Sequence, residues 1–207
     1  MSKFIVVSGG VLSGLGKGVV ASSIAWLLSS RLKNIVTLKC DGYINQDPGT
    51  MNPVEHGEVF VLDDGGEVDM DFGHYERFLN IDCRANWSLT MGKVLSEVRN
   101  KERIGEYLGK TVQYIPHVQN HIVEKILEIS TKQNSDLTII EIGGTVGDLE
   151  NDLYFRAANE LKKYVEEEDI LYVHLTYVPV LKGVGEQKTK PTQQSIEILS
   201  GKYKIMP

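Results

Sequence analysis

Residues 3–18 read Lys-Phe-Ile-Val-Val-Ser-Gly-Gly-Val-Leu-Ser-Gly-Leu-Gly-Lys-Gly, and this segment is the strongest indication of the fold. Residues 3–8 are a short, β-branched apolar run that predicts a buried strand. Residues 9–18 are a glycine-rich turn, and residues 19–31 have the pattern of a helix. This order predicts a phosphate-binding loop, because backbone N–H groups and a helix N-terminus converge on one anion. Lys17 would add a positive charge for the outer phosphates.

The loop departs from the phosphate-loop pattern G-x-x-x-x-G-K-[ST] at two places. Counting back from Gly16, the first glycine should be residue 11, which is Val11, so Gly9 and Gly10 come early. Gly18 stands where a Ser or Thr would offer a hydroxyl to Mg²⁺. A metal would therefore need other ligands. A turn without a ligand is the alternative, and the glycines and the lysine between a strand and a helix disfavour it.

Length and charge narrow the class of protein. The 207 residues can bury one substantial core, and the net charge of −6 makes nucleic acid and anionic membranes poor main partners. The N-terminus lacks the layout of a signal peptide, and no apolar run approaches a membrane span. Cys40 and Cys83 fit neither a metal spacing nor a disulfide framework. We therefore expect a protein of the reducing cytoplasm.

Strand patterns alternate with helix patterns along the rest of the chain. We expect further strands at residues 34–39, 59–62, 112–115, 136–144 and 170–178. We expect further helices at residues 90–108, 117–130, 151–168 and 192–199. This alternation predicts an α/β fold with a mainly parallel, doubly wound sheet and right-handed crossovers.

Charged residues gather at the predicted carboxyl ends of strands, where open α/β sheets place their sites. Lys39 and Asp41 follow the second strand, and Glu141 lies near the end of a strongly apolar one. Residues 63–71 carry five carboxylates, of which Asp69 and Asp71 would share one face of an extended segment. Such oxygen ligands suit Mg²⁺. The alternatives are a solvated lysine, a solvated acidic turn and a buried structural glutamate.

Residues 185–195 form a second loop with concentrated polar groups. Lys188 and Lys190 flank Thr189 just before Pro191, and a helix pattern follows. Cations, hydroxyls and helix N–H groups together favour a second phosphate chain. Exposed loop lysines are the alternative, with similar weight on chemistry alone.

These residues resemble the CTP synthase family over essentially the whole chain. Seven motifs carry the resemblance in the family's order: GGVLSGLGKG (9–18), YIN (43–45), DPGT (47–50), HGEVFV (56–61), GHYERF (73–78), EIGGTVGD (141–148) and KTKPTQ (188–193). The resemblance implies a phosphate-loop NTPase type of fold, similar to dethiobiotin synthetase. It implies that ATP phosphorylates UTP at O4 and that ammonia then displaces the phosphate to give CTP.

The resemblance also assigns roles to residues of this chain. Lys17 and Lys39 would be catalytic, and Asp71 and Glu141 would ligate Mg²⁺. ATP would be bound by Gly14, Leu15, Gly16, Lys17, Gly18, Val19 and Asp71. UTP would be bound by Ser13, Lys188, Thr189, Lys190, Pro191, Thr192 and Gln193. CTP as feedback inhibitor would use the same triphosphate residues together with Asp148, Leu149 and Glu150.

The resemblance covers only the synthetase (amidoligase) half of the family. Residues 1–207 are therefore expected to be a synthetase domain cut short at its C-terminal end, with the glutaminase domain that supplies ammonia outside this chain. The family implies a homotetramer and GTP as allosteric activator. Two positions depart from the family pattern: Gly42, where proline is frequent, and residues 151–154, which read Asn-Asp-Leu-Tyr in place of Ser-x-Pro-Phe.

Three other functions compete with UTP amination. A deviant phosphate-loop ATPase of the partitioning or metal-insertion type would share the fold but would not need residues 188–193. A dinucleotide-binding dehydrogenase is excluded, because no G-x-G-x-x-G follows the first strand. A non-catalytic assembly or filament subunit would not need Lys17, Asp71, Glu141 and Lys188.

Overall fold

The computed structural model describes residues 2–181, 183 and 185–207. Its centre is a parallel five-stranded sheet in the order β5-β2-β6-β1-β7. These strands are β1 (Lys3–Gly9), β2 (Ile35–Asp41), β5 (Ser88–Thr90), β6 (Leu137–Ile142) and β7 (Ile170–Leu175). Because all five strands run the same way, their carboxyl ends lie along one edge of the sheet, which gathers the loops that follow them.

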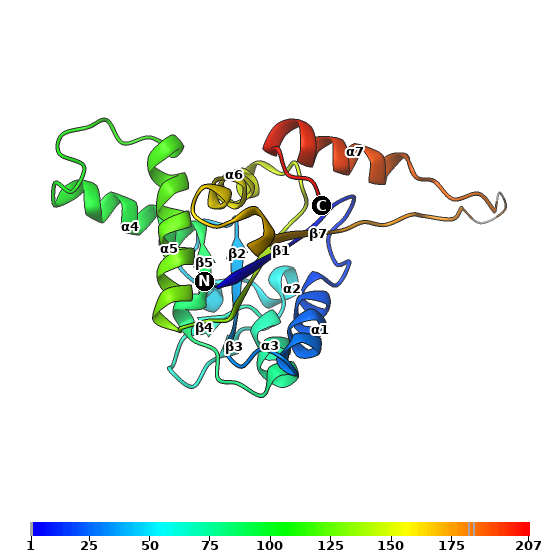
Figure 1. Ribbon diagram of the computed structural model, residues 1–207, viewed down its shortest axis with the longest axis horizontal. Helices are drawn as coiled ribbons and strands as arrows, with labels where there is room; N and C mark the ends of the chain where they lie inside the picture. Colours follow the sequence, from blue (N-terminus) through cyan, green and yellow to red (C-terminus); the bar gives the residue numbers. More distant parts are fainter. Residues whose placement is uncertain (1, 182, 184) are drawn as a thin grey trace.

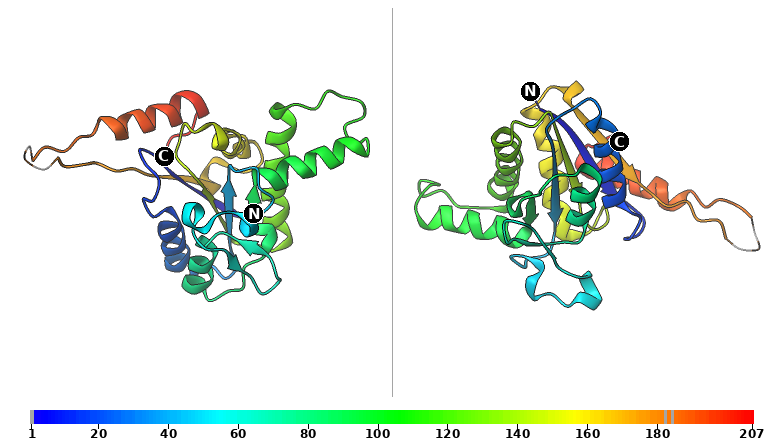
Figure 2. Two further views of the ribbon diagram at one scale, coloured as in Figure 1. Left: turned by 180° about the vertical axis from the view of Figure 1, so that it is seen from behind. Right: turned by 90° about the horizontal axis from the view of Figure 1, so that it is seen from below.

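Helices cover both faces of this sheet (Figure 1). On one face lie α1 (Lys17–Ser29) and α3 (Asp71–Leu79), which pack against each other. On the other face lie α5 (Gln119–Lys132) and α6 (Asp152–Glu160), again packed together. Figure 2 shows the same layers from behind and from below. The expected doubly wound α/β fold with a mainly parallel sheet is thus confirmed.

The three central strands are buried on both faces, as parallel sheets covered by helices require. Every residue of β2 and β6 is buried, and β1 is buried after its first residue. Val7, Leu38 and Ile139 are fully inaccessible to solvent. These uninterrupted apolar runs explain why the central strands are the part of the fold that local sequence predicts best.

Two strand predictions need correction. Residues 112–115 form no strand: from Tyr114 to Val118 the chain makes a wide helical turn that leads into α5. The strand that completes the sheet is β5, beside β2, and the sequence did not predict it. Its three residues are all buried and are too few to produce a periodic pattern. Residues 59–62 contribute β3 (Phe60–Val61), which pairs with β4 (Glu67–Val68) in a separate antiparallel ribbon.

Several helix boundaries also differ from the prediction. The surface helix α4 (Met91–Arg103) ends early, and Gly105 follows it with a φ of 83° that only glycine adopts freely. Helix α6 stops at Glu160 and short 3₁₀ turns follow, whereas α7 (Lys190–Ile198) begins two residues before the prediction. A further short helix is α2 (Pro53–His56).

The chain leaves the sheet after β7 as an arm. Residues 176–181 lead outward and residues 185–189 lead back to α7, joined by an antiparallel bridge between Val180 and Gln187. In Figure 1 this arm and the start of α7 extend well beyond the body. None of the helices in the described ranges has both the length and the apolar content needed to cross a lipid bilayer.

Candidate functional site

The glycine loop between β1 and α1 has the backbone conformation of an anion cradle. Gly14 and Gly16 have φ angles of 77° and 87°, in the left-handed region that favours glycine. Gly16 directly precedes the first residue of α1 and caps that helix without a side chain. The first N–H groups of α1 are therefore free for a ligand.

Lys17 folds back across the loop instead of extending into solvent. Its Nζ donates a hydrogen bond to the carbonyl of Gly144, 2.7 Å away, and the residue is only 8% exposed. A Cβ on Gly9 would lie 3.0 Å from Lys17 Cδ, so glycine at position 9 makes room for this lysine. Burial and the nearby Lys39 lower the pKa of Lys17. An anion placed beside this ammonium would relieve that electrostatic cost.

The strongest charge cluster lies across the ends of β2 and β6. Lys39 and Glu141 are register partners on these strands, and Lys39 Nζ lies 3.0 Å from Glu141 Oε1. The same Nζ also bonds Asp71 at the start of α3, and the Tyr75 hydroxyl donates to the other oxygen of Glu141. Burial alone would lower the pKa of Lys39, but the surrounding carboxylates hold it well above its usual value. Lys39 holds the pKa of Asp71 below its usual range against the opposing effect of burial.

Asp71 packs directly over the loop glycine that lacks a hydroxyl. A Cβ on Gly18 would lie 2.9 Å from Asp71 Cγ and closer still to Oδ1. The carboxylate therefore fills the space in which the side chain of a Ser or Thr at position 18 would stand. The predicted strand with Asp69 and Asp71 on one face is wrong, because Asp71 begins α3 and its N–H bonds the carboxylate of Asp69.

Asp41 adds a buried acid to the same edge of the sheet. It is 8% exposed, its Oδ2 has no hydrogen-bond partner, and burial raises its pKa to about 7. Gly143 makes room for it, since a Cβ there would lie 3.2 Å from Asp41 Cγ and closer to Oδ1. Near neutral pH this carboxyl group is thus divided between its protonated and ionised forms.

The second predicted phosphate segment lies at the start of α7. Lys190 and Pro191 are the first residues of α7, and Thr189 precedes them as the cap. The Thr192 hydroxyl bonds Thr176 Oγ1 at 3.2 Å, and Gln193 Nε2 donates to Thr189 Oγ1 at 3.3 Å. Lys188 pairs with Glu186 at 2.5 Å.

A cleft of about 240 Å³ connects this segment with the phosphate loop. Its lining includes Val11 from the loop, Thr145 from the turn after β6, and Pro191 from α7. Ser13, also on this loop, is exposed. Lys39 contacts both Asp71 and Glu141, and Lys17 lies near enough for the charges of these groups to shift its pKa. The α7 segment lies across the cleft from the glycine loop.

The turn after β6 holds the residues expected to bind an inhibitor. Asp148 accepts a hydrogen bond from the N–H of Thr145 at 2.9 Å, and a short 3₁₀ turn (Leu149–Asn151) follows. Leu149 is 84% exposed. A Cβ on Gly42 would lie 2.7 Å from both Glu150 and Asn151. The two departures from the family pattern are therefore in contact with each other.

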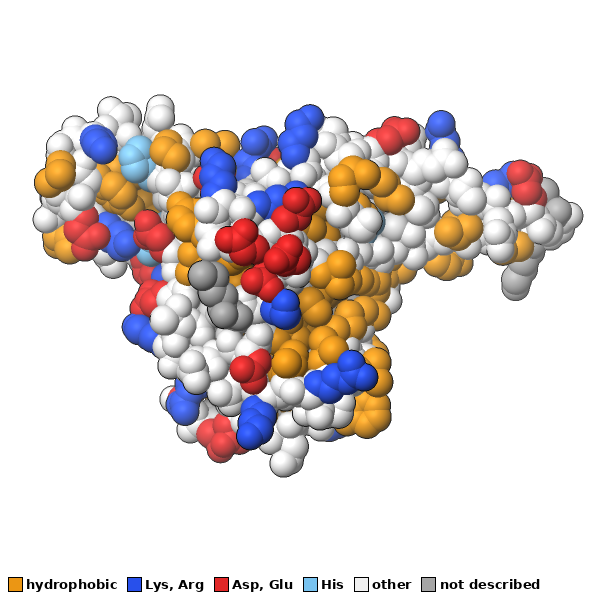
Figure 3. Space-filling view, in the orientation of Figure 1, with side chains coloured by type: hydrophobic (Ala, Val, Ile, Leu, Met, Phe, Trp, Pro, Cys, Tyr) orange, Lys and Arg blue, Asp and Glu red, His pale blue; other side chains and the backbone are white. Residues whose placement is uncertain are grey.

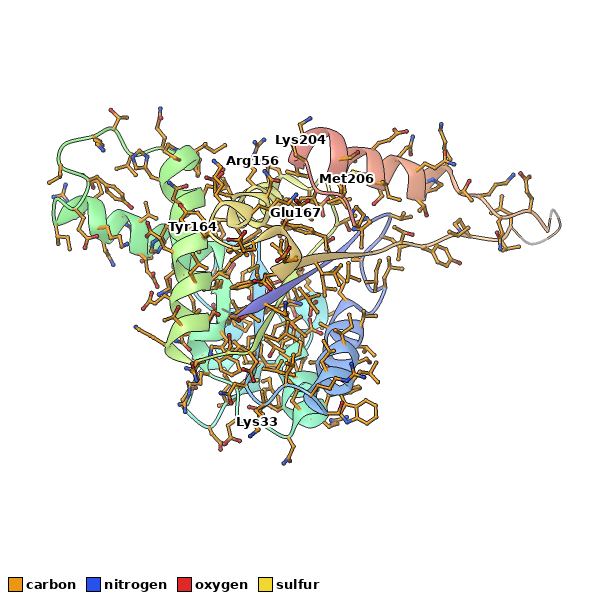
Figure 4. The ribbon with its side chains drawn as sticks, in the orientation of Figure 1. Lys33, Arg156, Tyr164, Glu167, Lys204 and Met206 are labelled. Atoms are coloured by element: carbon orange, nitrogen blue, oxygen red, sulfur yellow. The ribbon has the colours of Figure 1, made fainter. Side chains whose placement is uncertain are left out.

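Some groups of this region were not anticipated from the sequence. Tyr75 lies one helical turn after Asp71, a spacing that could have indicated it. Ser8, His174 and Ser195 form a hydrogen-bonded chain across β1, β7 and α7 that depends on the order of strands. The acidic run at residues 166–169, by contrast, precedes β7 and so lies at the amino end of that strand; Figure 4 labels Glu167.

Comparison with known proteins gives one consistent result. The family model described as CTP synthase N-terminus matches residues 3–203. CTP synthase of Borreliella burgdorferi is 55% identical over 198 residues, and that of Pyrococcus abyssi is 54% identical over 199 residues; each match covers 96% of this chain and 37% of the relative. CTP synthase of Lactiplantibacillus plantarum is 50% identical over 207 residues, 100% of this chain and 38% of the relative. This chain therefore belongs to the CTP synthase family.

Proposed function

We propose that this chain forms the synthetase part of an enzyme that converts UTP to CTP. The γ-phosphoryl group of ATP passes to O4 of UTP, leaving ADP, and ammonia then adds at C4 as inorganic phosphate leaves. The observation that carries the proposal is the convergence of Lys17, Lys39, Asp71 and Glu141 at the carboxyl ends of β1, β2 and β6. Membership of the family supports it, although the chain spans only about 37% of the length of the relatives cited above.

In this proposal the two lysines handle the charge of phosphoryl transfer. Residues 14–19 bind the phosphates of ATP through backbone N–H groups and the start of α1. Lys17 leaves the Gly144 carbonyl to meet the outer phosphates, and Lys39 neutralises the charge that develops during transfer. Phosphoryl transfer demands positioning and electrostatic stabilisation rather than covalent participation of the protein, which agrees with this set of residues.

Asp71 and Glu141 are the proposed ligands of Mg²⁺. The donor set fits, because Mg²⁺ is usually held by one or two carboxylates, with substrate phosphates and waters completing its shell. Asp71 lies over Gly18, where a phosphate-loop hydroxyl would otherwise reach the ion. Bound Mg²⁺ would offset charge on the phosphates.

The segment at the start of α7 is the proposed site of the UTP triphosphate. Ser13, residues 188–193 and the N–H groups of α7 offer hydroxyls, cations and amides across the cleft from the phosphate loop. CTP as inhibitor would share this segment and add contacts from Asp148, Leu149 and Glu150. A Cβ on Gly42 would lie 2.7 Å from Glu150, so glycine at position 42 leaves room for this part of the proposed inhibitor pocket.

Larger assembly belongs to the same proposal. A homotetramer is supported by apolar side chains exposed on α1, where Trp26 is 56% and Leu27 is 64% exposed; Figure 3 shows apolar groups gathered over this helix. A glutaminase domain following in the same chain would supply ammonia, GTP would activate that supply, and the enzyme would work in the cytoplasm without nucleic acid or membrane partners.

Product formation tests the proposed function directly. The full-length protein is mixed with ATP, UTP, Mg²⁺ and ammonium chloride, and the conversion of UTP to CTP is followed by absorbance. We expect CTP and phosphate in equal amounts, and loss of both when EDTA removes Mg²⁺. Phosphate release that proceeds without UTP would instead identify an ATPase switch, and the absence of CTP from well-folded protein would reject the proposal.

Adding a methyl group at Gly18 tests the position of Asp71. We expect Gly18→Ala to raise the Mg²⁺ concentration needed for half-maximal CTP formation about tenfold, because the new Cβ displaces the Asp71 carboxylate. The measurement is a Mg²⁺ titration at saturating ATP and UTP. Gly201→Ala is the control, since a Cβ there meets nothing within 4 Å. An unchanged Mg²⁺ requirement in Gly18→Ala would separate Asp71 from metal binding.

A further inference from the structure

Gly10 is a glycine that the phosphate-loop pattern does not explain. A Cβ at this position would lie 2.7 Å from His174 Nε2 and closer still to Ser195 Oγ. His174 belongs to β7 and Ser195 to α7, so three segments distant in sequence meet at this point. Glycine is therefore required here by the packing of two other side chains, independently of any ligand.

His174 connects two buried serines. Ser8 and His174 are register partners on β1 and β7, and Ser8 Oγ lies 2.9 Å from His174 Nδ1. On the other side of the ring, His174 Nε2 lies 2.5 Å from Ser195 Oγ. Ser8 and Ser195 are 5% and 4% exposed. A continuous series of hydrogen bonds thus connects Ser8, near the end of β1, with Ser195, in the middle of α7.

The protonation state of His174 suits this bridging role. Burial and the nearby Lys17 lower its pKa to about 4, so the ring is neutral near pH 7. A neutral imidazole has one N–H donor and one acceptor nitrogen. The Ser8 hydroxyl also faces the carbonyl of Val173 at 3.4 Å. The consistent arrangement has His174 Nδ1–H donating to Ser8 and the Ser195 hydroxyl donating to His174 Nε2.

Few other polar contacts hold the first half of α7 to the sheet. The Thr192 hydroxyl reaches Thr176 and the carbonyl of Tyr177 at 3.2 and 3.3 Å, in a more exposed position. On the N-terminal side of Thr192, α7 continues into the arm that precedes it in the sequence (Figure 1). The bond between His174 and Ser195 is therefore the buried link that sets where the start of α7 lies relative to the phosphate loop.

We propose that His174 and Ser195 are positioning residues that hold the start of α7 at a set distance from the phosphate loop. This inference rests on the proposed function, in which residues 188–193 bind the triphosphate of UTP. Phosphoryl transfer needs the donor and acceptor in register, and a small displacement of one binding segment weakens that alignment. The hydrogen bonds from Ser8 through His174 to Ser195 would keep the two binding segments aligned.

The test compares two serine variants of the full-length protein. We expect Ser195→Ala to raise the KM for UTP about fivefold to tenfold, because one buried hydrogen bond is lost, while the KM for ATP changes less than about twofold. Ser200→Ala is the matched control: within the described residues its hydroxyl bonds carbonyls of its own helical segment alone, at Ile196 (3.0 Å) and Glu197 (3.4 Å). An equal rise of both KM values, or no rise for UTP, would overturn the proposal.

A second pair of variants separates positioning from general stability. The side-chain amide of Gln in His174→Gln can still form a hydrogen bond with Ser195, whereas Leu in His174→Leu cannot. We therefore expect His174→Gln to bind UTP more tightly than His174→Leu. Equal affinities would contradict the proposal.

Hydrogen exchange gives a readout that does not depend on turnover. We expect amides of residues 192–196 to exchange at least about fivefold faster in Ser195→Ala than in Ser200→Ala. Unchanged exchange would overturn the positioning role. Failure of the wild-type protein to make CTP would reject the proposed function while leaving this measurement decisive for α7.

Discussion

Replacing Lys17 with alanine is expected to lower the rate of CTP formation by about a thousandfold. The Lys17 ammonium is buried beside the glycine loop, and burial lowers its pKa. Its loss removes charge stabilisation from the transferring phosphoryl group. The measurement is the initial rate of CTP formation with ammonium as nitrogen source, at saturating ATP and UTP.

The fold should survive this substitution. The loop is shaped by glycines, and the only polar contact of the Lys17 side chain found in the described ranges is its bond to the Gly144 carbonyl. We expect the free energy of unfolding to change by about 1 kcal/mol or less, since removal of a buried cation beside Lys39 offsets the lost hydrogen bond.

Lys33→Ala is the control for Lys17→Ala. Lys33 is exposed at the opposite edge of the sheet, just before β2 (Figure 4). We expect its CTP formation to match wild type. Substantial turnover in a well-folded Lys17→Ala variant would remove Lys17 from the catalytic role.

The second large effect is expected on stability. Glu141→Gln should lower the free energy of unfolding by about 3 kcal/mol, because the buried Lys39 ammonium loses an anionic partner. Gln has nearly the volume of Glu, so the loss reflects charge and hydrogen bonding rather than a cavity. The measurement is urea denaturation of the nucleotide-free protein followed by circular dichroism.

A double variant identifies the cause. If the cost arises from an uncompensated buried cation, Lys39→Met in the Glu141→Gln background should restore at least half of the lost stability. The two single changes and the double change form a thermodynamic cycle, and strictly additive effects would show that Lys39 and Glu141 are not coupled. The Tyr75 hydroxyl, which donates to Glu141, can still bond the glutamine oxygen.

Local sequence was sufficient to predict an element where one pattern, such as an apolar run or a glycine-rich turn, was strong. The apolar runs of β1, β2 and β6 predicted buried parallel strands, and the glycine loop with Lys17 predicted a cradle before a helix. Prediction failed for β5, which has three residues and is a strand only because β2 lies beside it. It failed again at residues 112–115, which pair with no strand in the described part of the chain and lead into a wide helical turn.

The candidate site divides in the same way. Lys17, Lys39 and Glu141 could be chosen from residue type and from their positions at or just after strand ends, because parallel strands bring their carboxyl ends to one edge. Asp71 could be chosen only from the density of carboxylates at residues 63–71. Which of these side chains bond one another could not be predicted from the sequence. That Lys39 bonds both carboxylates follows from the register of β2 with β6 and from the packing of α3 on α1.

The fold class and the family could be predicted from the amino-acid sequence, since each depends on short-range patterns and motifs. Packing between distant segments explains why Gly9, Gly10 and Gly18 are glycines: Lys17, the pair His174–Ser195 and Asp71 each occupy the space beside one of them. The physical reason is steric exclusion between segments far apart in the chain, which no local pattern records.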